Sequence, residues 1–490
     1  MLKTNVIRLN DLVANKMSRF QTLLEHAGFD KKEYQFNGVA WCVKNELRPV
    51  PPCGVRGGLI CDEMGLGKTI TMIGTMFVNC MAKTLIVVPP VLIKQWQMEI
   101  LRTSGHKVLL YYGADKKNIT SEQYDKARIV LTSYNTILRK DCPLKKIFWN
   151  RVIFDEAHHL RNAKTQTYQS CLKLQTHIRW LVTGTPIQNR KSDYYSLCNF
   201  LGLDECYYKK TPEYVVKYFL LRRTKNEVGI MLPAVNKHKE CVTWKNEKEK
   251  LMAREIHSLI PNQTNVLQID KKLLAQMFGR GGVLVAFLRA RQACIMTHLM
   301  GKHVKRFEQN GELEAGDYAE AMRNTSKVDY VVDKIISRRD NGKGKIVFCH
   351  FIEEIDVISE KLREYGLEKV VTYDGRNSGG ENLSLLSDPA DVLIIQIQTG
   401  CEGLNLQKNF SEIYFVSPHW NPSVEDQAIA RCHRIGQKKE VDVFHFEMED
   451  FTKISEDEDE DKKKEEICLE HYVNFRQNAK RVISQTLMGI

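Results

Sequence analysis

Short apolar runs rich in β-branched residues recur along the chain, and polar or helix-compatible stretches separate them. The first set lies at 84–89 (TLIVVP), 127–132 (ARIVLT), 151–154 (RVIF) and 180–183 (WLVT). A second set lies at 345–349 (KIVFC), 370–373 (VVTY), 391–397 (DVLIIQI) and 412–416 (EIYFV). Runs that are apolar throughout are typical of strands buried on both faces of a parallel sheet. The alternation predicts the α/β class, with two doubly wound parallel-sheet lobes.

The two sets of runs are separated by charged, helix-compatible sequence. A chain of 490 residues is too long for one hydrophobic core, so several domains are expected. We predict a first lobe at 1–204, a mainly helical insert and linker at 205–325 and a second lobe at 326–452. A charged linker and a C-terminal helix follow at 453–490, with the run EDEDEDKKKEE at 456–466 as a solvated segment.

The net charge and the spacing of the cysteines limit the classes of function that fit this sequence. The formal net charge of +12 favours attraction to phosphate backbones, although a basic protein need not bind nucleic acid. The fourteen cysteines include no C-x-x-C pair, so we expect mostly buried, reduced thiols rather than a zinc ribbon or a RING-type site. No signal-peptide pattern opens the chain, and no run reaches the roughly 18 apolar residues that span a bilayer. We therefore expect an intracellular protein without a membrane partner.

A glycine-rich segment follows the apolar residues Gly58, Leu59 and Ile60 and precedes a helix-compatible stretch. In Gly65-Leu66-Gly67-Lys68-Thr69, the glycines allow backbone N–H groups to approach a phosphate, Lys68 supplies a cation and the Thr69 hydroxyl can ligate Mg²⁺. Asp62 replaces the first glycine of the G-x-x-x-x-G-K-[ST] pattern. A purely structural glycine turn is the alternative interpretation.

The tetrapeptide Asp155-Glu156-Ala157-His158 directly follows the run RVIF. A carboxylate at a strand end can hold Mg²⁺, and its neighbour can polarise an attacking water. The alternative is an exposed acidic turn. Because a buried strand precedes the tetrapeptide, we assign Asp155 to the metal and Glu156 to the water.

Two further segments are candidates for the same site. Upstream, a Gln35 amide can pair with the N6/N7 edge of adenine, whereas Trp41 is expected to be a core residue. Downstream, Arg431 and Arg434 are three residues apart, which predicts one helical face. Guanidinium groups held against a γ-phosphate stabilise charge in phosphoryl transfer. A surface arginine pair making salt bridges is the alternative.

The order of these segments resembles the Swi/Snf-type remodelling ATPases of helicase superfamily 2. The likeness extends from Tyr34 to about Phe446. It rests on ten segments: YQFNGVAW, DEMGLGKT, TLIVVPPVLIKQW, IVLTSYNTI, DEAHHLRN, VTGTPIQN, LLRRTKNEV, KIVFCHF, EGLNL and HWNPSVEDQAIARCHRIGQ. Within the family, RWLVTGTPIQN and LRARQAC look most like the repair-associated branch, but the RING insertion of that branch is missing from this sequence.

The resemblance implies two RecA-like lobes with ATP and Mg²⁺ between them. The implied ATP-handling positions are Gln35, Asp62, Glu63, Met64, Gly65, Leu66, Gly67, Lys68, Thr69, Asp155, Glu156, Gln427, Arg431 and Arg434. The implied DNA-contacting positions are Pro89, Gln95, Trp96, Thr132, Ser133, Thr183, Gly184, Thr185, His350, Phe351, Gly403, Asn405 and Trp420. Family members translocate along duplex DNA without separating its strands, so binding independent of sequence is expected.

The sequence departs from the family at Gly400-Cys401-Glu402-Gly403, where Ala-Gly-Gly is usual, and this puts the coupling between DNA and ATP in question. The expected activity is an ATP-dependent duplex DNA translocase that remodels or displaces bound protein. The alternatives are a viral-type transcription ATPase or termination factor, a strand-separating helicase and an inactive DNA-binding scaffold. Double-stranded DNA is the expected partner, with nucleosomes or RNA polymerase as protein partners. The nucleus is the expected compartment, or the host cytoplasm or virion for a viral protein.

Overall fold

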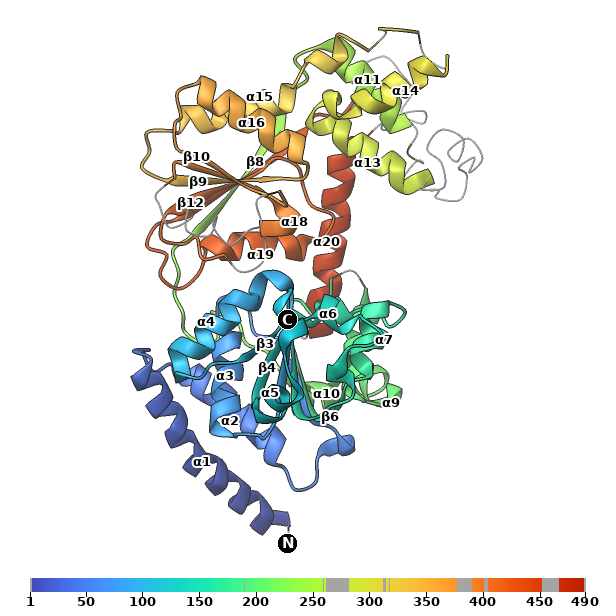
Figure 1. Cartoon of the computed structure of the whole chain (residues 1–490). Helices are drawn as coiled ribbons and strands as arrows, with labels where there is room; N and C mark the ends of the chain where they lie inside the picture. The colour runs from blue at the N-terminus through green and yellow to red at the C-terminus, as the bar shows by residue number, and fades with distance from the viewer. Residues whose placement is uncertain are drawn as a thin grey trace. The chain divides into compact units, whose positions relative to one another are not determined.

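The structure is a computed structural model that describes residues 2–188, 190–258, 260, 282–311, 314–316, 318–376, 390–400, 404–451 and 467–488. The chain divides into two compact units (Figure 1). Unit 1 comprises Met1–Met231 and Ile483–Ile490, and unit 2 comprises Leu232–Val482. Each unit is built around its own parallel sheet.

The sheet of unit 1 has seven strands in the order β3-β4-β2-β5-β6-β1-β7, and every neighbouring pair is parallel. The strands are β1 (Arg56–Ile60), β2 (Thr84–Val88), β3 (Leu109–Tyr111), β4 (Ile129–Ser133), β5 (Phe148–Asp155), β6 (Gln175–Val182) and β7 (Leu220–Leu221). The helices are α1 (Leu2–His26), α2 (Glu33–Leu47), α3 (Lys68–Val78), α4 (Ile93–Ser104), α5 (Ser121–Lys126), α6 (Tyr134–Ile137), α7 (Gln166–Leu172), α8 (Lys191–Leu201), α9 (Glu205–Lys209) and α10 (Pro212–Phe219).

Alternate strand residues enter two separate cores, one on each face of this sheet. In β2, Leu85 and Val87 pack on one side with α7 and α8, whereas Ile86 and Val88 pack on the other with α3 and α4. Apolar side chains at successive positions are therefore all buried, which explains the continuous apolar runs. This three-layer arrangement leaves the strand ends, rather than the sheet faces, open for binding.

The sheet of unit 2 has six parallel strands in the order β10-β11-β9-β12-β13-β8. The strands are β8 (Val235–Val242), β9 (Gly344–Cys349), β10 (Val370–Tyr373), β11 (Val392–Gln396), β12 (Phe410–Phe415) and β13 (Val441–Met448). The helices are α11 (Glu247–Ser258), α13 (Gly282–Ile295), α14 (Gly301–Gln309), α15 (Ser326–Ser337), α16 (Ile352–Glu364), α18 (Ile397–Gly400), α19 (Pro422–Cys432) and α20 (Leu469–Met488). Helices α15 and α16 cover one face of this sheet and α19 covers the other (Figure 1).

The predicted α/β class with two parallel-sheet lobes is confirmed, and all eight predicted strands are present. The observed division after Met231 differs from the predicted boundary at 204/205, because α10 and β7 pack with the first sheet. Strand β8 adds the start of the predicted insert to the edge of the second sheet. The described remainder of that insert, up to α15, contains helices α11, α13 and α14. The charged run at 456–466 lies outside the described residues.

Nine of the described cysteines are buried, as predicted, and four are exposed. Within the described residues, no helix combines the length and the apolar character that a membrane crossing requires.

Candidate functional site

The glycine segment of unit 1 forms a loop between the end of β1 and the first turn of α3. Gly67 precedes the helix with φ of 77°, in the left-handed region that glycine adopts without strain. A Cβ at Gly67 would lie 2.6 Å from Gln35 Nε2, so a larger residue would displace the glutamine. The loop therefore presents backbone N–H groups and the N-terminal end of an eleven-residue helix, a combination suited to a phosphate.

Three predicted segments meet at this loop. Gln35 is buried and donates through Nε2 to the Leu66 carbonyl at 3.5 Å. Lys68 donates through Nζ to the Asp62 carbonyl at 2.9 Å. A Cβ at Gly184 would lie 3.3 Å from Lys68 Nζ, which places the Thr-Gly-Thr segment beside the lysine. Gln35, Lys68 and Gly184 are thus neighbours within one unit.

Asp62, which replaces the first glycine of the pattern, is fully buried beneath the loop. Its carboxylate accepts two hydrogen bonds from Arg223, at 3.0 Å to Nε and 2.5 Å to Nη2. Arg223 also donates to the Tyr34 carbonyl, and its guanidinium lies over the Tyr34 ring. The next residues of the loop are held in the same way, since Lys225 pairs with Glu63 at 3.0 Å. Asp62 and Glu63 therefore hold the loop in place, and Arg223 is a positioning residue.

Asp155 is the last residue of β5, as predicted, and its carboxylate is held by two donors. Trp96 Nε1 donates to Oδ2 at 2.7 Å and the Glu156 backbone N–H donates to Oδ1 at 2.9 Å. Burial, followed by the neighbouring Glu156 carboxylate, raises the pKa of Asp155 to about 7. A divalent cation at this carboxylate would counteract that shift, because it favours the charged form.

Glu156 has φ of 46° and ψ of 50°, a left-handed conformation that is uncommon for residues other than glycine. Such backbone strain is concentrated at functional sites. The Glu156 carboxylate lies 3.2 Å from His158 Nδ1, which in turn lies 3.5 Å from the Thr183 hydroxyl. His158 therefore links the Asp-Glu-Ala-His segment to the Thr-Gly-Thr segment, a role that the sequence reasoning did not assign.

A buried ion pair fixes the elements that carry these side chains. Arg151 of β5 binds Glu46 of α2 through two hydrogen bonds of 2.6 and 2.5 Å, and both side chains are 0% exposed. Glu46 also accepts from Trp180 Nε1 and from Asn79 Nδ2, each at 2.8 Å. Because Asn79 caps α3, the pair connects the helix of Gln35, the helix of Lys68 and the strand of Asp155.

The residues of unit 2 differ from their prediction in one respect. Arg431 lies in the last turn of α19, but the helix ends at Cys432 and Arg434 lies beyond it. The prediction of one helical face for both arginines is therefore wrong, because His433 leaves the helical conformation and Gly436 continues the turn with φ of 98°. Arg434 donates to the Asn405 side chain. Gln427 is buried, and its Nε2 has no hydrogen-bond partner among the residues that the structure describes.

The structure defines each unit separately. The approach of Arg431 and Arg434 in unit 2 to Lys68 in unit 1 therefore stays a prediction. In unit 1, Met64, Gly65, Lys68 and Thr69 are half-buried and Leu66 is buried.

Several predicted DNA contacts are buried in the core of unit 1, and their polar atoms have other partners. Trp96 is 1% exposed and binds Asp155, so we correct its assignment from DNA contact to positioning of that carboxylate. Thr132 donates to the Tyr111 carbonyl at 2.8 Å, and Ser133 caps α6 by accepting from the Thr136 N–H. Thr132, Ser133 and Thr183 have no exposed surface, so direct DNA contact is excluded for them in this structure.

The remaining predicted positions differ in exposure. Pro89 is buried, Gln95, Gly184 and Thr185 are half-buried, and the Thr185 hydroxyl lacks a partner. In unit 2, Phe351 and Trp420 are half-buried, Asn405 is exposed and His350 is buried, whereas Gly403 lies outside the described residues.

His350 and Phe351 lie at the start of α16, where one buried carboxylate organises the backbone. Glu354 accepts from the His350 N–H at 2.8 Å and from the Phe351 N–H at 3.0 Å. Burial raises the pKa of Glu354 to about 7, and the same cause lowers the pKa of His350. The Glu354 carboxylate thus caps the start of α16, but its charged form costs free energy because it is buried.

We expect Glu354→Gln to flatten the dependence of stability on pH. The pKa of Glu354 in the folded chain is about 7, above its ordinary value of 4.5. Below pH 4.5 the carboxyl is protonated, so burial does not penalise the folded state. This contribution to stability is lost as the pH rises through 7, where the buried carboxyl must become charged. The loss is on the order of 3 kcal/mol. Urea midpoints at pH 5 and pH 8 measure it, with the exposed Glu360→Gln on the same helix as the control. Equal pH profiles for wild type and Glu354→Gln would contradict the assignment.

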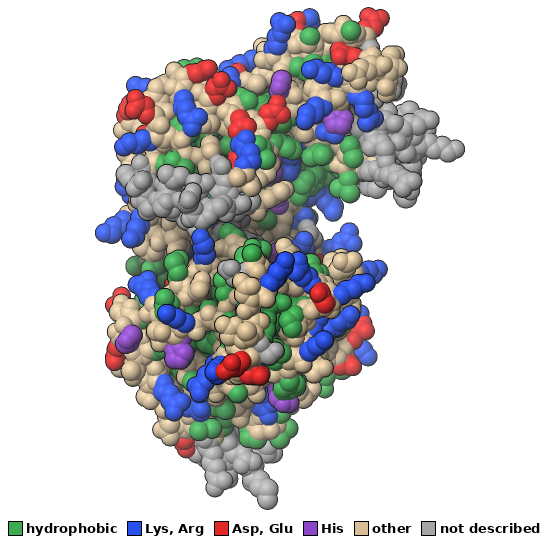
Figure 2. Space-filling view, in the orientation of Figure 1, with side chains coloured by type: hydrophobic (Ala, Val, Ile, Leu, Met, Phe, Trp, Pro, Cys, Tyr) green, Lys and Arg blue, Asp and Glu red, His purple; other side chains and the backbone are tan. Residues whose placement is uncertain are grey.

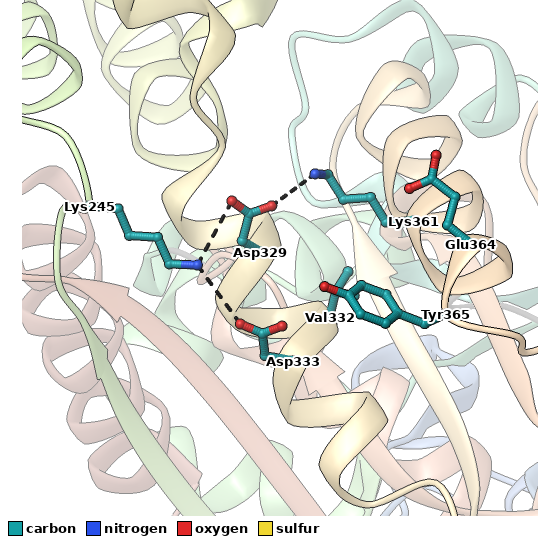
Figure 3. Close-up of a pocket in the computed structure, with 7 residues that line it drawn as sticks. All are labelled: Lys245, Asp329, Val332, Asp333, Lys361, Glu364 and Tyr365. Atoms are coloured by element: carbon teal, nitrogen blue, oxygen red, sulfur yellow. Dashed lines mark ion pairs between the residues drawn. The ribbon is translucent and has the colours of Figure 1, made fainter.

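A pocket of about 360 Å³ on unit 2 lies apart from these residues (Figure 3). Asp329 pairs with Lys245 at 3.9 Å and with Lys361 at 2.9 Å, and Asp333 pairs with Lys245 at 3.8 Å. Glu364 adds a further carboxylate to the lining. Because both lysines are already paired, this pocket is a poor site for a phosphate.

Residues 34–214 match the SNF2-related domain, and residues 326–436 match the helicase conserved C-terminal domain. Together the two matches cover more than half of the chain. It belongs to the Swi/Snf-type family of DNA-dependent ATPases in helicase superfamily 2.

This Swi/Snf-type chain is similar to proteins of different architecture. It is 27% identical to the probable global transactivator of Orgyia pseudotsugata multicapsid polyhedrosis virus, over 91% of this chain and 89% of that protein. It is 26% identical to human chromodomain-helicase-DNA-binding protein 1, over 91% of this chain and 27% of that protein. It is 28% identical to the chromatin structure-remodeling complex protein SYD of Arabidopsis thaliana, over 85% of this chain and 12% of that protein.

Among solved structures, it is similar to the SWI2/SNF2 ATPase core of Sulfolobus solfataricus in complex with double-stranded DNA. The identity is 23%, the TM-score is 0.39, and the match covers 86% of this chain and 88% of that one.

Proposed function

We propose that this Swi/Snf-type ATPase uses ATP hydrolysis to translocate along double-stranded DNA and to displace or remodel bound protein. The single observation that supports the proposal most is the convergence of Gln35, Lys68, Gly184 and Glu156 within unit 1. Lys68, Glu156 and Gly184 follow three different strands of one parallel sheet, at the edge where such sheets bind nucleotides, and Gln35 of α2 contacts the same loop. If the glycine segment were only a structural turn, it would not need these side chains beside it.

The residues present fit ATP with Mg²⁺. The turn at Gly67 is left-handed and a Cβ there would displace Gln35, Lys68 provides an ammonium group, and Thr69 and Asp155 offer the oxygen ligands that Mg²⁺ prefers. Bound Mg²⁺-ATP supplies the phosphoryl group and neutralises charge on the phosphates. Gln35 would contact the adenine, and Lys68 would hold the phosphates.

Glu156 would orient and deprotonate the attacking water. Its backbone is left-handed, and His158 lies beside its carboxylate at 3.2 Å. Trp96 would hold Asp155 in place as a metal ligand. Arg431, Arg434 and Gln427 of unit 2 would complete the site only when the units close, which would couple closure to hydrolysis.

Duplex DNA is the proposed track. Figure 2 shows Lys and Arg side chains gathered over the part of unit 1 that carries α6 and α7. Arg139 and Lys140 follow α6, Lys164 precedes α7 and Lys173 follows it, and all four are exposed. Cations of this kind bind phosphates without reading base sequence.

We expect duplex DNA to raise the ATP turnover of the full chain by at least about tenfold, equivalent to ~1.4 kcal/mol in the barrier. Turnover is measured at fixed salt without DNA and with duplex, single-stranded and nucleosomal DNA, using Lys68→Ala to subtract contaminating ATPase. Stimulation should decline steeply with salt. Equal rates with and without duplex would contradict the proposal. Triplex displacement without strand displacement separates a translocase from a strand-separating helicase.

A second candidate function is release of transcripts or polymerase, as in a viral transcription ATPase. It is favoured by the viral relative, because the chain spans 89% of that protein, which is described as a probable global transactivator. Co-purification with RNA polymerase would support this role, and preferential sliding of nucleosomes would count against it. The nucleus is the proposed compartment for a chromatin role, and the host cytoplasm or virion for a viral one.

A further inference from the structure

Unit 2 contains a cluster of three metal-ligating side chains that the ATPase mechanism does not use. His257 comes from α11, Cys294 from α13 and Cys468 from the residue before α20. All three are at least nine-tenths buried. Cys294 Sγ lies 3.6 Å from His257 Nε2 and 3.5 Å from Cys468 Sγ, and the three ligand atoms lie within 4.8 Å of one another.

Two of these separations match edges of a tetrahedral zinc site. With Zn–S bonds near 2.3 Å and Zn–N bonds near 2.05 Å, tetrahedral angles give about 3.8 Å between two sulfurs and about 3.5 Å between sulfur and nitrogen. The observed distances of 3.5 and 3.6 Å therefore require little movement of either pair. A bonded disulfide would instead bring the sulfurs to about 2.05 Å.

The orientation of His257 is also that of a ligand. Its Nδ1 lies 2.6 Å from the Ala253 carbonyl, and since a carbonyl only accepts, Nδ1 must carry the proton. The unprotonated Nε2 then faces the two sulfurs. A hydrogen bond from the remote nitrogen to a backbone carbonyl is the usual support of a metal-bound histidine.

The described surroundings are largely apolar, although the buried Arg291 of α13 interacts electrostatically with Cys294. Met252, Ala253 and Phe451 belong to the same buried core, and the Phe451 ring lies 4.7 Å from the His257 ring. The nearest buried lysine, Lys327, is neutralised by Glu470. Two thiolates would balance the charge of one divalent cation, so the core would remain electrically neutral.

We propose that His257, Cys294 and Cys468 form a structural zinc site that fastens the start of α20 to α11 and α13. Binding releases the two thiol protons to solvent, and water completes the fourth position. The ligands come from segments far apart in the sequence, so the site would tie the insert of unit 2 to the C-terminal helix. Its occupancy would raise the stability of unit 2 without contributing a group to the nucleotide site.

The first test uses the wild-type full chain without an affinity tag. After reduction and removal of metals, Zn²⁺ alone is titrated and the bound metal is measured by mass spectrometry, with Co²⁺ as a spectroscopic probe. We expect one tight equivalent, a thiolate-to-cobalt charge-transfer band and the intense visible bands of tetrahedral coordination. Zn²⁺ should also protect Cys294 and Cys468 from alkylation, as read from their peptides. Failure of Zn²⁺ to bind, or octahedral cobalt spectra, would overturn the proposal.

The second test compares substituted chains. Cys294→Ser and Cys468→Ser should each weaken Zn²⁺ binding by at least about 100-fold, because they remove a ligand rather than a supporting group. Cys241→Ser, an exposed cysteine of the same unit, is the matched control and should bind as wild type does. Unchanged binding in both ligand variants would overturn the proposal. So would a native Cys294–Cys468 disulfide in a chain that binds no Zn²⁺ after reduction.

Discussion

Glu156→Gln should lower ATP turnover of the full chain by about a thousandfold, within the range that a general base contributes. Nucleotide binding should change little, because Lys68, Thr69 and Asp155 remain and the glutamine is isosteric. The variant loses only the carboxylate that would take the proton from water. Steady-state turnover with duplex DNA and titration of a fluorescent ATP analogue measure the two quantities separately.

The exposed carboxylate Glu205 of the same unit provides the control, since Glu205→Gln removes equal charge far from the phosphate loop in sequence. Turnover near the wild-type rate in Glu156→Gln would mean that another group activates the water. Loss of ATP binding would instead show that the substitution disturbs the loop, and would leave the role of the carboxylate unsupported.

Arg151→Met should destabilise unit 1 by roughly 3–5 kcal/mol, because it leaves the Glu46 carboxylate buried without its guanidinium. Both partners are 0% exposed, so water cannot replace the lost hydrogen bonds. ATP binding should weaken in parallel, since the pair holds the elements that carry Gln35, Lys68 and Asp155. Urea unfolding of the full chain, followed by ATP titration under native conditions, measures both effects.

A double variant separates the cost of the unpaired Glu46 charge from the cost of lost packing. In Glu46→Gln with Arg151→Met, the amide oxygen can still accept from Trp180, and no charge is left in the core. We expect this double variant to recover most of the lost stability. The exposed pair of Lys126 and Glu122 is the control, because removing it should cost under about 1 kcal/mol. A single variant as stable as wild type would contradict the role assigned to Arg151.

The sequence predicted most of the strands that are buried on both faces, but it missed the buried interior strand β13 and three of the four edge strands, β3, β7 and β8. Strand β8 is polar or charged at every position from 236 to 240, as is common on edge strands, so it resembled linker sequence. Strand β7 has only two residues and is defined by its pairing with β1. The phosphate loop and the acidic segment were predictable because both follow continuous apolar runs.

The wrong predictions for Trp96 and Arg434 could have been avoided from local sequence patterns. Ile93, Trp96 and Ile100 recur at the spacing of one helical face, which places Trp96 in the core. Gly436, soon after Arg434, is typical of a helix that has ended. The partnership of Arg223 with Asp62 had no such signal, because 161 positions separate the two residues and only the fold brings them together.

The anchoring of Asp62 and Glu63 by Arg223 and Lys225 has a mechanical consequence. These arginine and lysine residues are among the last of unit 1 before the chain departs at Met231. A force on the chain beyond Met231 would therefore act on Asp62 and Glu63 before it acted on the central strands of the sheet. A force on the connecting segment would therefore act first on the loop that we propose binds the triphosphate.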